Sequence, residues 1–312
     1  MNTNICNIQK NEYTLLDRKS HLYYKQCRMA DIFFDMEEKE TTEKEETKVE
    51  KPKEPVKFLV STDSFSNCGL DMIFDLAKEA GYDGIDLAIW KTNDARNVDY
   101  VKKLAIKHDL PVKSIQLSNK VNQVEMNKAL DLCEATGADT IAINAPDVFN
   151  IKAFNFLSDN LDAYKKENRH IHFSIINPEN ENFLAIPKYH FSNIVEIIKK
   201  YGCYLAVDVS NFESDVLEND FMRKLNNFLP YISIFYLSDK NRVGDGHLLP
   251  GEGTLKLESL LKKIKQGKYA KYISTKITIK KADLADSEKL TSILKKARKY
   301  YQENFEEVEI EE

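Results

Sequence analysis

Short apolar runs alternate with stretches of helical spacing from Val56 to about Phe305, and this alternation constrains the fold most strongly. Eight runs rich in β-branched and aromatic residues occur in order: KFLVS (57–61), GIDLAIW (84–90), VKSIQL (112–117), DTIAIN (139–144), IHFSII (171–176), CYLAVDV (203–209), YISIFYL (231–237) and YISTKI (272–277). Parallel strands that are covered by helices read as near-continuous apolar runs of this kind. Eight strand–helix units predict an α/β fold, a closed (β/α)8 TIM barrel rather than an open doubly wound sheet.

The stretches between the apolar runs have the spacing of amphipathic helices. Clear examples are 70–81, 98–109, 124–137 and 191–202. Three of these stretches end in a glycine, the residue that most readily adopts the left-handed conformation of a helix C-cap: Gly81, Gly137 and Gly202. Neither a GxGxxG nor a GxxxxGK[ST] motif follows the first run, which argues against a nucleotide-binding fold.

The segment before the barrel has a different composition. Residues 36–54 contain eight Glu, five Lys and no aromatic residue. They predict a disordered charged linker over 36–55, because such a segment buries too little apolar surface to fold alone. Residues 1–35 are too short for a domain but carry aromatic side chains that could dock on a protein partner. The barrel is predicted over 56–305, followed by an acidic tail over 306–312.

The bulk composition argues against several functional classes. The net charge is −5 and the pI about 5.8, whereas a surface that grips DNA carries excess Lys and Arg. The five cysteines are scattered without a CxxC pair, which indicates reduced thiols rather than a zinc or disulfide framework. No apolar run approaches the ~18–20 residues of a membrane span, so the chain is expected to be cytoplasmic with no membrane partner.

A polar loop follows the seventh apolar run. The stretch HLLPGEG (247–253) lies between the run 231–237 and the helical stretch 255–266. Loops at the carboxyl ends of barrel strands hold the catalytic groups of this architecture. His247 and Glu252 are therefore candidate site residues. The two glycines of the stretch are expected to let the loop turn tightly, with amides that could contact a phosphate.

Five motifs occur in the order expected for one known family. They are AGYDGIDLAIW (80–90), GADTIAINAP (137–146), GCYLAVDVSNF (202–212), SDKNRVGDGHLLPGEGTLKLESLL (238–261) and ADLADSEKLTSILKKARKYYQENF (282–305). Together they resemble the xylose-isomerase-like TIM barrels, which include sugar phosphate isomerases and epimerases and the family 2 AP endonucleases. The resemblance covers about residues 56–305, and it implies the same barrel that the alternation predicts.

The resemblance also implies a divalent metal site inside the carboxyl-terminal mouth of the barrel. The usual isomerase ligands are a Glu ending strand five, an Asp ending strand six, a His on strand seven and a Glu ending strand eight. Carried over in that order, they fall on Ile176, Asp208, Tyr236 and Lys276, so Asp208 alone matches. A substrate-side His three residues after the Asp falls on Asn211.

The endonuclease branch has further metal ligands, and these are kept unevenly. Its Asp-x-His pair after strand seven is preserved as Asp245 and His247, while its histidines on strands three and four fall on Gln116 and Asn144. Hard divalent cations need several oxygen or imidazole ligands that converge on one point. The expectation is therefore that the usual catalytic metal is absent and that no cofactor is bound.

Lys276 suggests a replacement for the metal. In one hypothesis its ammonium stands where the cation stood and pairs with Asp208, because an unpaired buried carboxylate is expensive. In the other, Lys276 reaches solvent and Asp208 caps the following helix. A Schiff base at Lys276 is disfavoured, since that chemistry needs a lowered pKa and an adjacent carboxylate raises it.

His247 and Trp90 have two interpretations each. His247 could form a remnant metal pair with Asp245, or it could hydrogen-bond its loop to a neighbouring strand. The structural role is favoured because two ligands do not make a metal site. Trp90 ends the second run at the mouth of the barrel, where it could stack on a sugar ring or simply pack at the rim.

The resemblance favours a divergent sugar or sugar-phosphate isomerase or epimerase that works without the usual metal on a small carbohydrate ligand. The alternative is a non-catalytic barrel that binds a ligand or a protein, and an AP endonuclease is disfavoured by charge and by the lost ligands. The predicted catalytic residues are Asp208, Lys276 and His247. The residues predicted to contact the ligand are Trp90, Asn144, Asn177, Asn211, Tyr236, Asp239 and Glu252.

Overall fold

The computed structural model describes residues 55–66, 68–147, 149–179 and 202–310, together with two short strands, β6 (Asn182–Phe183) and β7 (Ile186–Pro187). The expectations for residues 1–54, for the helical stretch before Gly202 and for the last two residues lie outside this part of the chain. β6 and β7 pair with each other in antiparallel fashion.

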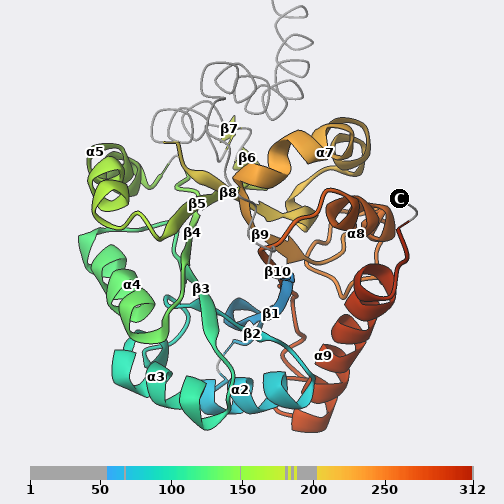
Figure 1. Cartoon of the computed structure of the whole chain (residues 1–312), viewed down its shortest axis with the longest axis horizontal. Coiled ribbons are helices and arrows are strands. Elements are labelled where there is room, and N and C mark those ends of the chain that lie inside the picture. Colours follow the sequence, from blue (N-terminus) through green and yellow to red (C-terminus); the bar gives the residue numbers. More distant parts are fainter. Residues whose placement is uncertain are drawn as a thin grey trace, which may run out of the picture. The chain divides into compact units, whose positions relative to one another are not determined.

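Eight parallel strands close into a barrel, with β1 hydrogen-bonded to both β2 and β10. The strands are β1 (Lys57–Ser61), β2 (Gly84–Ala88), β3 (Val112–Leu117), β4 (Thr140–Asn144), β5 (His172–Ile176), β8 (Tyr204–Asp208), β9 (Ile232–Leu237) and β10 (Tyr272–Thr275). Figure 1 shows the helices arranged outside the strands. The predicted TIM barrel is therefore confirmed.

The described helices are α2 (Leu70–Glu79), α3 (Val98–Lys107), α4 (Gln123–Thr136), α5 (Ile151–Glu167), α7 (Met222–Phe228), α8 (Leu257–Gln266) and α9 (Ser287–Tyr301). Of these, α2, α3, α4 and α8 follow predicted helical stretches to within a few residues. The residue at the predicted cap Gly137 has a φ of 77° and returns its amide to Cys133, as a left-handed C-cap does. Asn97, Asn122 and Asp286 cap the starts of α3, α4 and α9 with their side chains.

The ends of two strands decide where site residues lie. β1 and β3 cover the predicted runs in full, but β10 stops at Thr275 and β2 stops at Ala88. Lys276 is thus the first residue beyond β10, and Trp90 lies in the turn after β2. Both side chains leave the barrel wall at its carboxyl-terminal mouth, the end at which barrels hold their functional groups.

The barrel interior contains an apolar cluster and a group of buried polar side chains. Its apolar cluster contains Leu59, Ala142, Ile176, Ala206, Ile234 and Tyr236. Buried polar side chains come from the neighbouring strands β1, β2, β3 and β10: Ser61, Asp86, Ser114, Gln116 and Ser274. Burying polar groups costs free energy unless they are hydrogen-bonded. These polar side chains therefore do not contribute to stability as apolar ones would, which makes them candidates for a role beyond folding.

The described cysteines behave as ordinary core residues. Cys68, Cys133 and Cys203 are free and buried, and burial raises the pKa of both Cys133 and Cys203 to about 12. Their thiols therefore stay protonated at neutral pH and are poor nucleophiles. In the part of the chain that the structure describes, no helix is both long and apolar enough to cross a membrane.

Candidate active site

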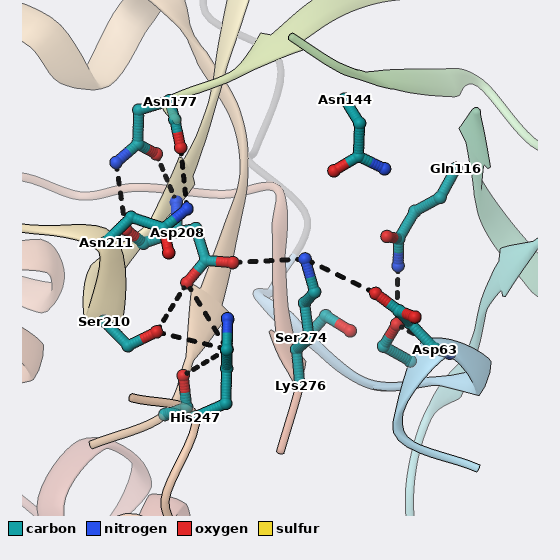
Figure 2. Close-up of polar contacts among 12 residues, drawn as sticks. Asp63, Gln116, Asn144, Asn177, Asp208, Ser210, Asn211, His247, Ser274 and Lys276 are labelled. Carbon is teal, nitrogen blue, oxygen red and sulfur yellow. Dashed lines mark hydrogen bonds and ion pairs between the residues drawn. The ribbon is translucent and has the colours of Figure 1, made fainter. Parts of the chain in front are cut away.

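The ammonium of Lys276 lies between two carboxylates at the mouth of the barrel (Figure 2). Its Nζ is 3.2 Å from Oδ2 of Asp208 and 3.5 Å from Oδ2 of Asp63. It also lies 5.0 Å from the centre of the Tyr236 ring, which forms the floor beneath it. We refer to Lys276, Asp208, Asp63 and His247 as the Lys276 centre.

Asp208 is held rigidly at the end of β8. Its side chain is fully buried, and its backbone amide and carbonyl both pair with the side chain of Asn177, at 2.6 and 3.0 Å. Ser210 donates a hydrogen bond to Oδ1 over 3.1 Å. The Asp208 carboxylate does not cap the helical turn that follows it, and the Lys276 side chain is only 11% exposed. This arrangement agrees with the hypothesis of a direct ion pair between Lys276 and Asp208. It differs from the alternative in which Lys276 reaches solvent and Asp208 caps the next helix.

The charges at this centre reinforce each other. Burial alone would raise the pKa of Asp208, but His247, Lys276 and the Ser210 hydroxyl outweigh it and hold that pKa below its usual range. Burial would lower the pKa of Lys276, yet Asp208 and Asp63 overcome it and the pKa is raised. Lys276 is therefore a fixed cation at neutral pH, with no free lone pair for a Schiff base.

Asp63 was not predicted from the sequence. It lies in a short helical turn directly after β1 (Thr62–Ser64), and its Oδ1 accepts an ion pair from Lys91 at 2.7 Å. The Lys91 Nζ in turn lies 4.4 Å from the centre of the Trp90 ring. An Asp in a strand-to-helix turn has no distinctive sequence signal, since turns commonly contain Asp. Its role follows only from the closure of the barrel, which brings β1 beside β10.

His247 has a strained backbone. Its φ is +55°, a conformation that non-glycine residues adopt uncommonly and that gathers at functional sites. Its Nδ1 lies 3.1 Å from Ser210 Oγ, 3.4 Å from Ser238 Oγ and 3.8 Å from Asp208 Oδ1. Its carbonyl accepts a hydrogen bond from Thr278 over 2.7 Å. Within the described residues, none hydrogen-bonds Nε2, which leaves that nitrogen available to a ligand.

The Lys276 centre opens into a cavity of about 370 Å³. The residues that line it are Asp63, Trp90, Ser118, Asn119, Asn144, Ala145, Ile176, Asn177, Pro178, Glu179, Asn211, His247 and Lys276. Four of them are asparagines, whose amides can both donate and accept hydrogen bonds. The Nδ2 group of Asn144 donates to the Leu117 carbonyl over 2.8 Å, so its Oδ1 is left as an acceptor.

Three residues expected to contact a ligand do not line this cavity. Tyr236 is fully buried beneath Lys276. Asp239 is also buried, with its carboxylate bonded to backbone amides of its own loop. Glu252 lies exposed on the loop surface. None of these three residues lines the cavity, whereas Trp90, Asn144, Asn177 and Asn211, which were also expected to contact a ligand, do lie in its wall.

Asp245 and Gln116, the other two positions of the endonuclease metal pattern, do not line the cavity either. Asp245 accepts a hydrogen bond from Asn241 within its own turn, at 2.9 Å. Gln116 lies inside the barrel and donates to Oδ2 of Asp86 and to Ser61. Across the described ranges, no group of three or more His, Cys, Asp and Glu side chains is arranged to hold a metal ion.

Asp86 lies among the buried polar side chains of the barrel interior. Burial raises its pKa to about 7, although the hydroxyls and amide around it and Lys276 pull the value down. Oδ1 of Asp86 has no hydrogen-bond partner among the described residues, and neither do Oε1 of Gln116, Oγ of Ser114 and Oη of Tyr236. Buried water commonly satisfies such groups. A carboxyl group in this position is half protonated near neutral pH.

Asp86→Asn is expected to flatten the dependence of stability on pH. The folded-state pKa of about 7 lies above the ordinary aspartate pKa of 3.8, so the unfolded chain loses this proton at lower pH than the folded chain does. The free energy of unfolding therefore falls between about pH 4 and pH 7, by on the order of 4 kcal/mol for this group. Urea unfolding of both proteins across that range measures the difference.

Asp131→Asn, at an exposed position of α4, is the matched control and is expected to leave the pH profile unchanged. Parallel profiles for the wild type and Asp86→Asn would show that Asp86 does not hold its proton in the folded state.

Comparison with known proteins agrees with this architecture. Residues 74–297 match the model of the family described as xylose isomerase-like TIM barrel. An uncharacterized protein of Mycobacterium tuberculosis is 27% identical over 100 residues, which are 29% of this chain and 36% of that protein. The chain thus spans about a third of the length of the curated relatives it matches.

Solved structures match over nearly the whole barrel. A D-allulose 3-epimerase from Methylomonas sp., solved with D-allulose, has a TM-score of 0.57 and 15% identity, over 81% of this chain and 98% of that chain. The IOLI protein, solved with a zinc atom, has a TM-score of 0.60 and 15% identity, over 80% and 99%. At this identity the likeness shows the fold alone. The family match extends over most of the barrel, and the chain belongs to the xylose isomerase-like TIM barrel family.

Proposed function

We propose that this chain binds a small carbohydrate in the cavity and catalyses an isomerase- or epimerase-type proton transfer without a divalent metal. The observation that carries the proposal is the Lys276 ammonium, 3.2 Å from Asp208, at the floor of a cavity lined with amides. The D-allulose 3-epimerase shares the fold, which supports the substrate class but does not fix it.

The side chains of the Lys276 centre do not fit a divalent ion. Asp208 is the carboxylate that the family pattern retains, and the ammonium within hydrogen-bonding distance of it already neutralises its charge. Ile176 offers no donor atom on the neighbouring strand. A divalent cation beside Lys276 would meet a like charge, and the two carboxylates of the centre, Asp208 and Asp63, are already paired with lysines. With one imidazole besides, the centre offers fewer free ligands than hard cations take.

The centre nevertheless offers the elements of proton transfer beside a carbonyl. Removing a proton from the carbon next to a carbonyl moves electrons onto the carbonyl oxygen and gives an enediolate. The fixed Lys276 ammonium would stabilise that developing negative charge, because a preorganised charge in a water-poor site needs little rearrangement. Nε2 of His247 would accept the proton and return it to the neighbouring carbon, while the hydroxyl proton moves to the former carbonyl oxygen, which gives isomerisation. Return to the same carbon from the same face regenerates the substrate, so epimerisation there would need a proton from the opposite face, for example from water.

Deuterium exchange tests the proposal. Protein treated with a chelator is incubated in D2O with ketoses and aldoses, and NMR follows loss of the C–H signal beside the carbonyl. We expect exchange without added metal. Exchange that appears only with stoichiometric Mn²⁺ would contradict the metal-free proposal.

A second candidate is a barrel that binds the sugar without turning it over. It is favoured by a specific observation: the two carboxylates of the Lys276 centre, Asp63 and Asp208, are already neutralised by Lys276 and Lys91. His247 is then the sole described base at the Lys276 centre. Saturable sugar binding with no exchange under any metal condition would support this second function.

His247→Gln is expected to slow the exchange about 10²–10⁴-fold, the usual contribution of a general base. Sugar affinity should change by only a few-fold, since glutamine retains hydrogen-bonding atoms. Ser238→Ala is the matched control, because Ser238 contacts Nδ1 at 3.4 Å while Ser210 and Asp208 remain. Equal exchange rates in wild type and His247→Gln would remove His247 from the chemistry.

A further inference from the structure

We propose that the cavity selects uncharged sugars over sugar phosphates, because the chain's own Asp239 carboxylate fills the anion-binding loop beside it. The inference rests on the proposed carbohydrate-binding function and narrows its substrate class. Three observations support it. The loop between β9 and α8 encloses the Asp239 carboxylate, the nearby lysines are paired with protein carboxylates, and the cavity wall contains acidic side chains.

The loop after the seventh barrel strand is where TIM barrels frequently hold phosphate. Here its backbone amides converge on Asp239. Oδ1 accepts hydrogen bonds from the amides of Lys240 and Leu255 over 2.8 and 3.0 Å, and Oδ2 accepts one from Gly251 over 3.0 Å. Converging backbone amides can hold an anion, as they do in anion-binding nests. Here three amides from separate parts of the loop meet, and the anion that they hold is a side chain of the protein.

The loop is built closely around that carboxylate. A Cβ added at Gly253 would come 2.2 Å from Oδ1 of Asp239, so a residue with a side chain does not fit there. Gly251 has a φ of +89°, which glycine adopts without strain. The two glycines that the sequence offered as phosphate contacts are therefore used to enclose Asp239, and the Gly251 amide is already bonded to it.

The nearby lysines have carboxylate partners as well. Lys240, whose side chain is 7% exposed, lies 3.3 Å from Glu179 and 3.8 Å from Glu213. Lys91 pairs with Asp63 at 2.7 Å. Both of these lysines are thus paired with protein carboxylates. A sugar phosphate that bound to either lysine would have to displace its carboxylate partner.

The cavity wall itself repels a phosphate. Its charged residues are Asp63 and Glu179, which are acidic, and Lys276, with His247 as a further titratable group. A phosphate dianion about 4 Å from Glu179 would be repelled by up to roughly 1 kcal/mol per unit charge in water. This is an upper limit, because Lys240 lies 3.3 Å from the same carboxylate. The asparagines of the wall instead offer uncharged donors and acceptors, which match the hydroxyls of a neutral sugar.

Calorimetric titration of the full chain tests the inference with matched pairs. The probes are D-allulose, D-tagatose and D-fructose, each beside its 6-phosphate, and inorganic phosphate. We expect at least one neutral sugar to bind about tenfold or more tightly than its phosphate, which corresponds to 1.4 kcal/mol. Tighter binding of the phosphates would overturn the selectivity but leave the carbohydrate function intact. A lack of binding by any sugar or sugar phosphate would remove both.

Glu179→Gln sharpens the test at a position that is a third exposed and therefore tolerant of change. Removing this carboxylate leaves Lys240 with less negative charge beside it. The affinity ratio between each sugar and its phosphate is expected to narrow several-fold. Glu258→Gln, exposed on α8, is the control and should leave the ratio unchanged. An unchanged ratio in Glu179→Gln would count against electrostatic exclusion of phosphate by the wall.

Discussion

Replacing Lys276 by methionine is expected to lower the free energy of unfolding by about 3–5 kcal/mol, the usual cost of removing one partner of a buried ion pair. The reason is that Asp208 is fully buried and would lose the ammonium 3.2 Å away. Asp63 would suffer less because it keeps Lys91. Urea unfolding near neutral pH measures the loss, and the deuterium exchange proposed above should disappear.

Two further variants isolate the ion pair. Adding Asp208→Asn to Lys276→Met removes the uncompensated charge and is expected to recover part of the lost stability. Lys295→Met removes an exposed lysine that pairs with Glu79 at 2.8 Å, and such surface pairs contribute only about 0–1 kcal/mol. A loss for Lys276→Met no larger than that for Lys295→Met would show that the central pair does not stabilise the barrel.

The double substitution Ile176→Glu with Lys276→Glu is expected to give the chain divalent-metal binding. It replaces the blocking ammonium by a carboxylate and adds a second carboxylate on the neighbouring strand, so that both converge with Asp208 and His247. Oxygen and imidazole donors of this kind suit divalent ions. A site that binds only the folded chain would add about 2.7 kcal/mol of stability at a metal concentration a hundred times Kd, visible as a rise in Tm with Mn²⁺.

The matched control is Ile176→Gln with Lys276→Gln, which has similar side-chain volumes but no added negative charge. It should gain little metal affinity, because neutral amides are weaker ligands for hard cations than carboxylates are. If both double variants fail to bind Mn²⁺ while remaining folded, the mouth of this barrel lacks the geometry of a latent metal site, and the idea that Lys276 replaced the ion loses its support.

The fold was predictable because each strand is an apolar run with a turn on either side. Residues 57–61 and 112–117 form strands over the full predicted runs, and the three glycines predicted at helix ends, Gly81, Gly137 and Gly202, have a positive φ. Strand ends were less predictable. Lys276 continues an apolar alternation in sequence, yet β10 stops one residue earlier, because local pattern does not reveal where neighbouring strands cease to pair.

The site was predictable only where a motif supplied it. The family pattern drew attention to Asp208, Lys276 and His247, and the structure brings these three together. Asp63 was missed because an Asp after a strand is common in turns, and its position beside Lys276 depends on barrel closure. Asp239 was expected to face a ligand, but its carboxylate is buried and accepts hydrogen bonds from amides 12 and 16 residues further along its own loop. A local sequence pattern does not show which way such a loop folds back.

Diffraction from crystals soaked in Mn²⁺, recorded at the manganese absorption edge, tests most directly whether an ammonium occupies the place of a divalent ion. We expect no anomalous peak at the mouth of the barrel, and electron density for Lys276 Nζ between Asp208 and Asp63. An anomalous peak bonded to Asp208, with the Lys276 side chain displaced towards solvent, would contradict it.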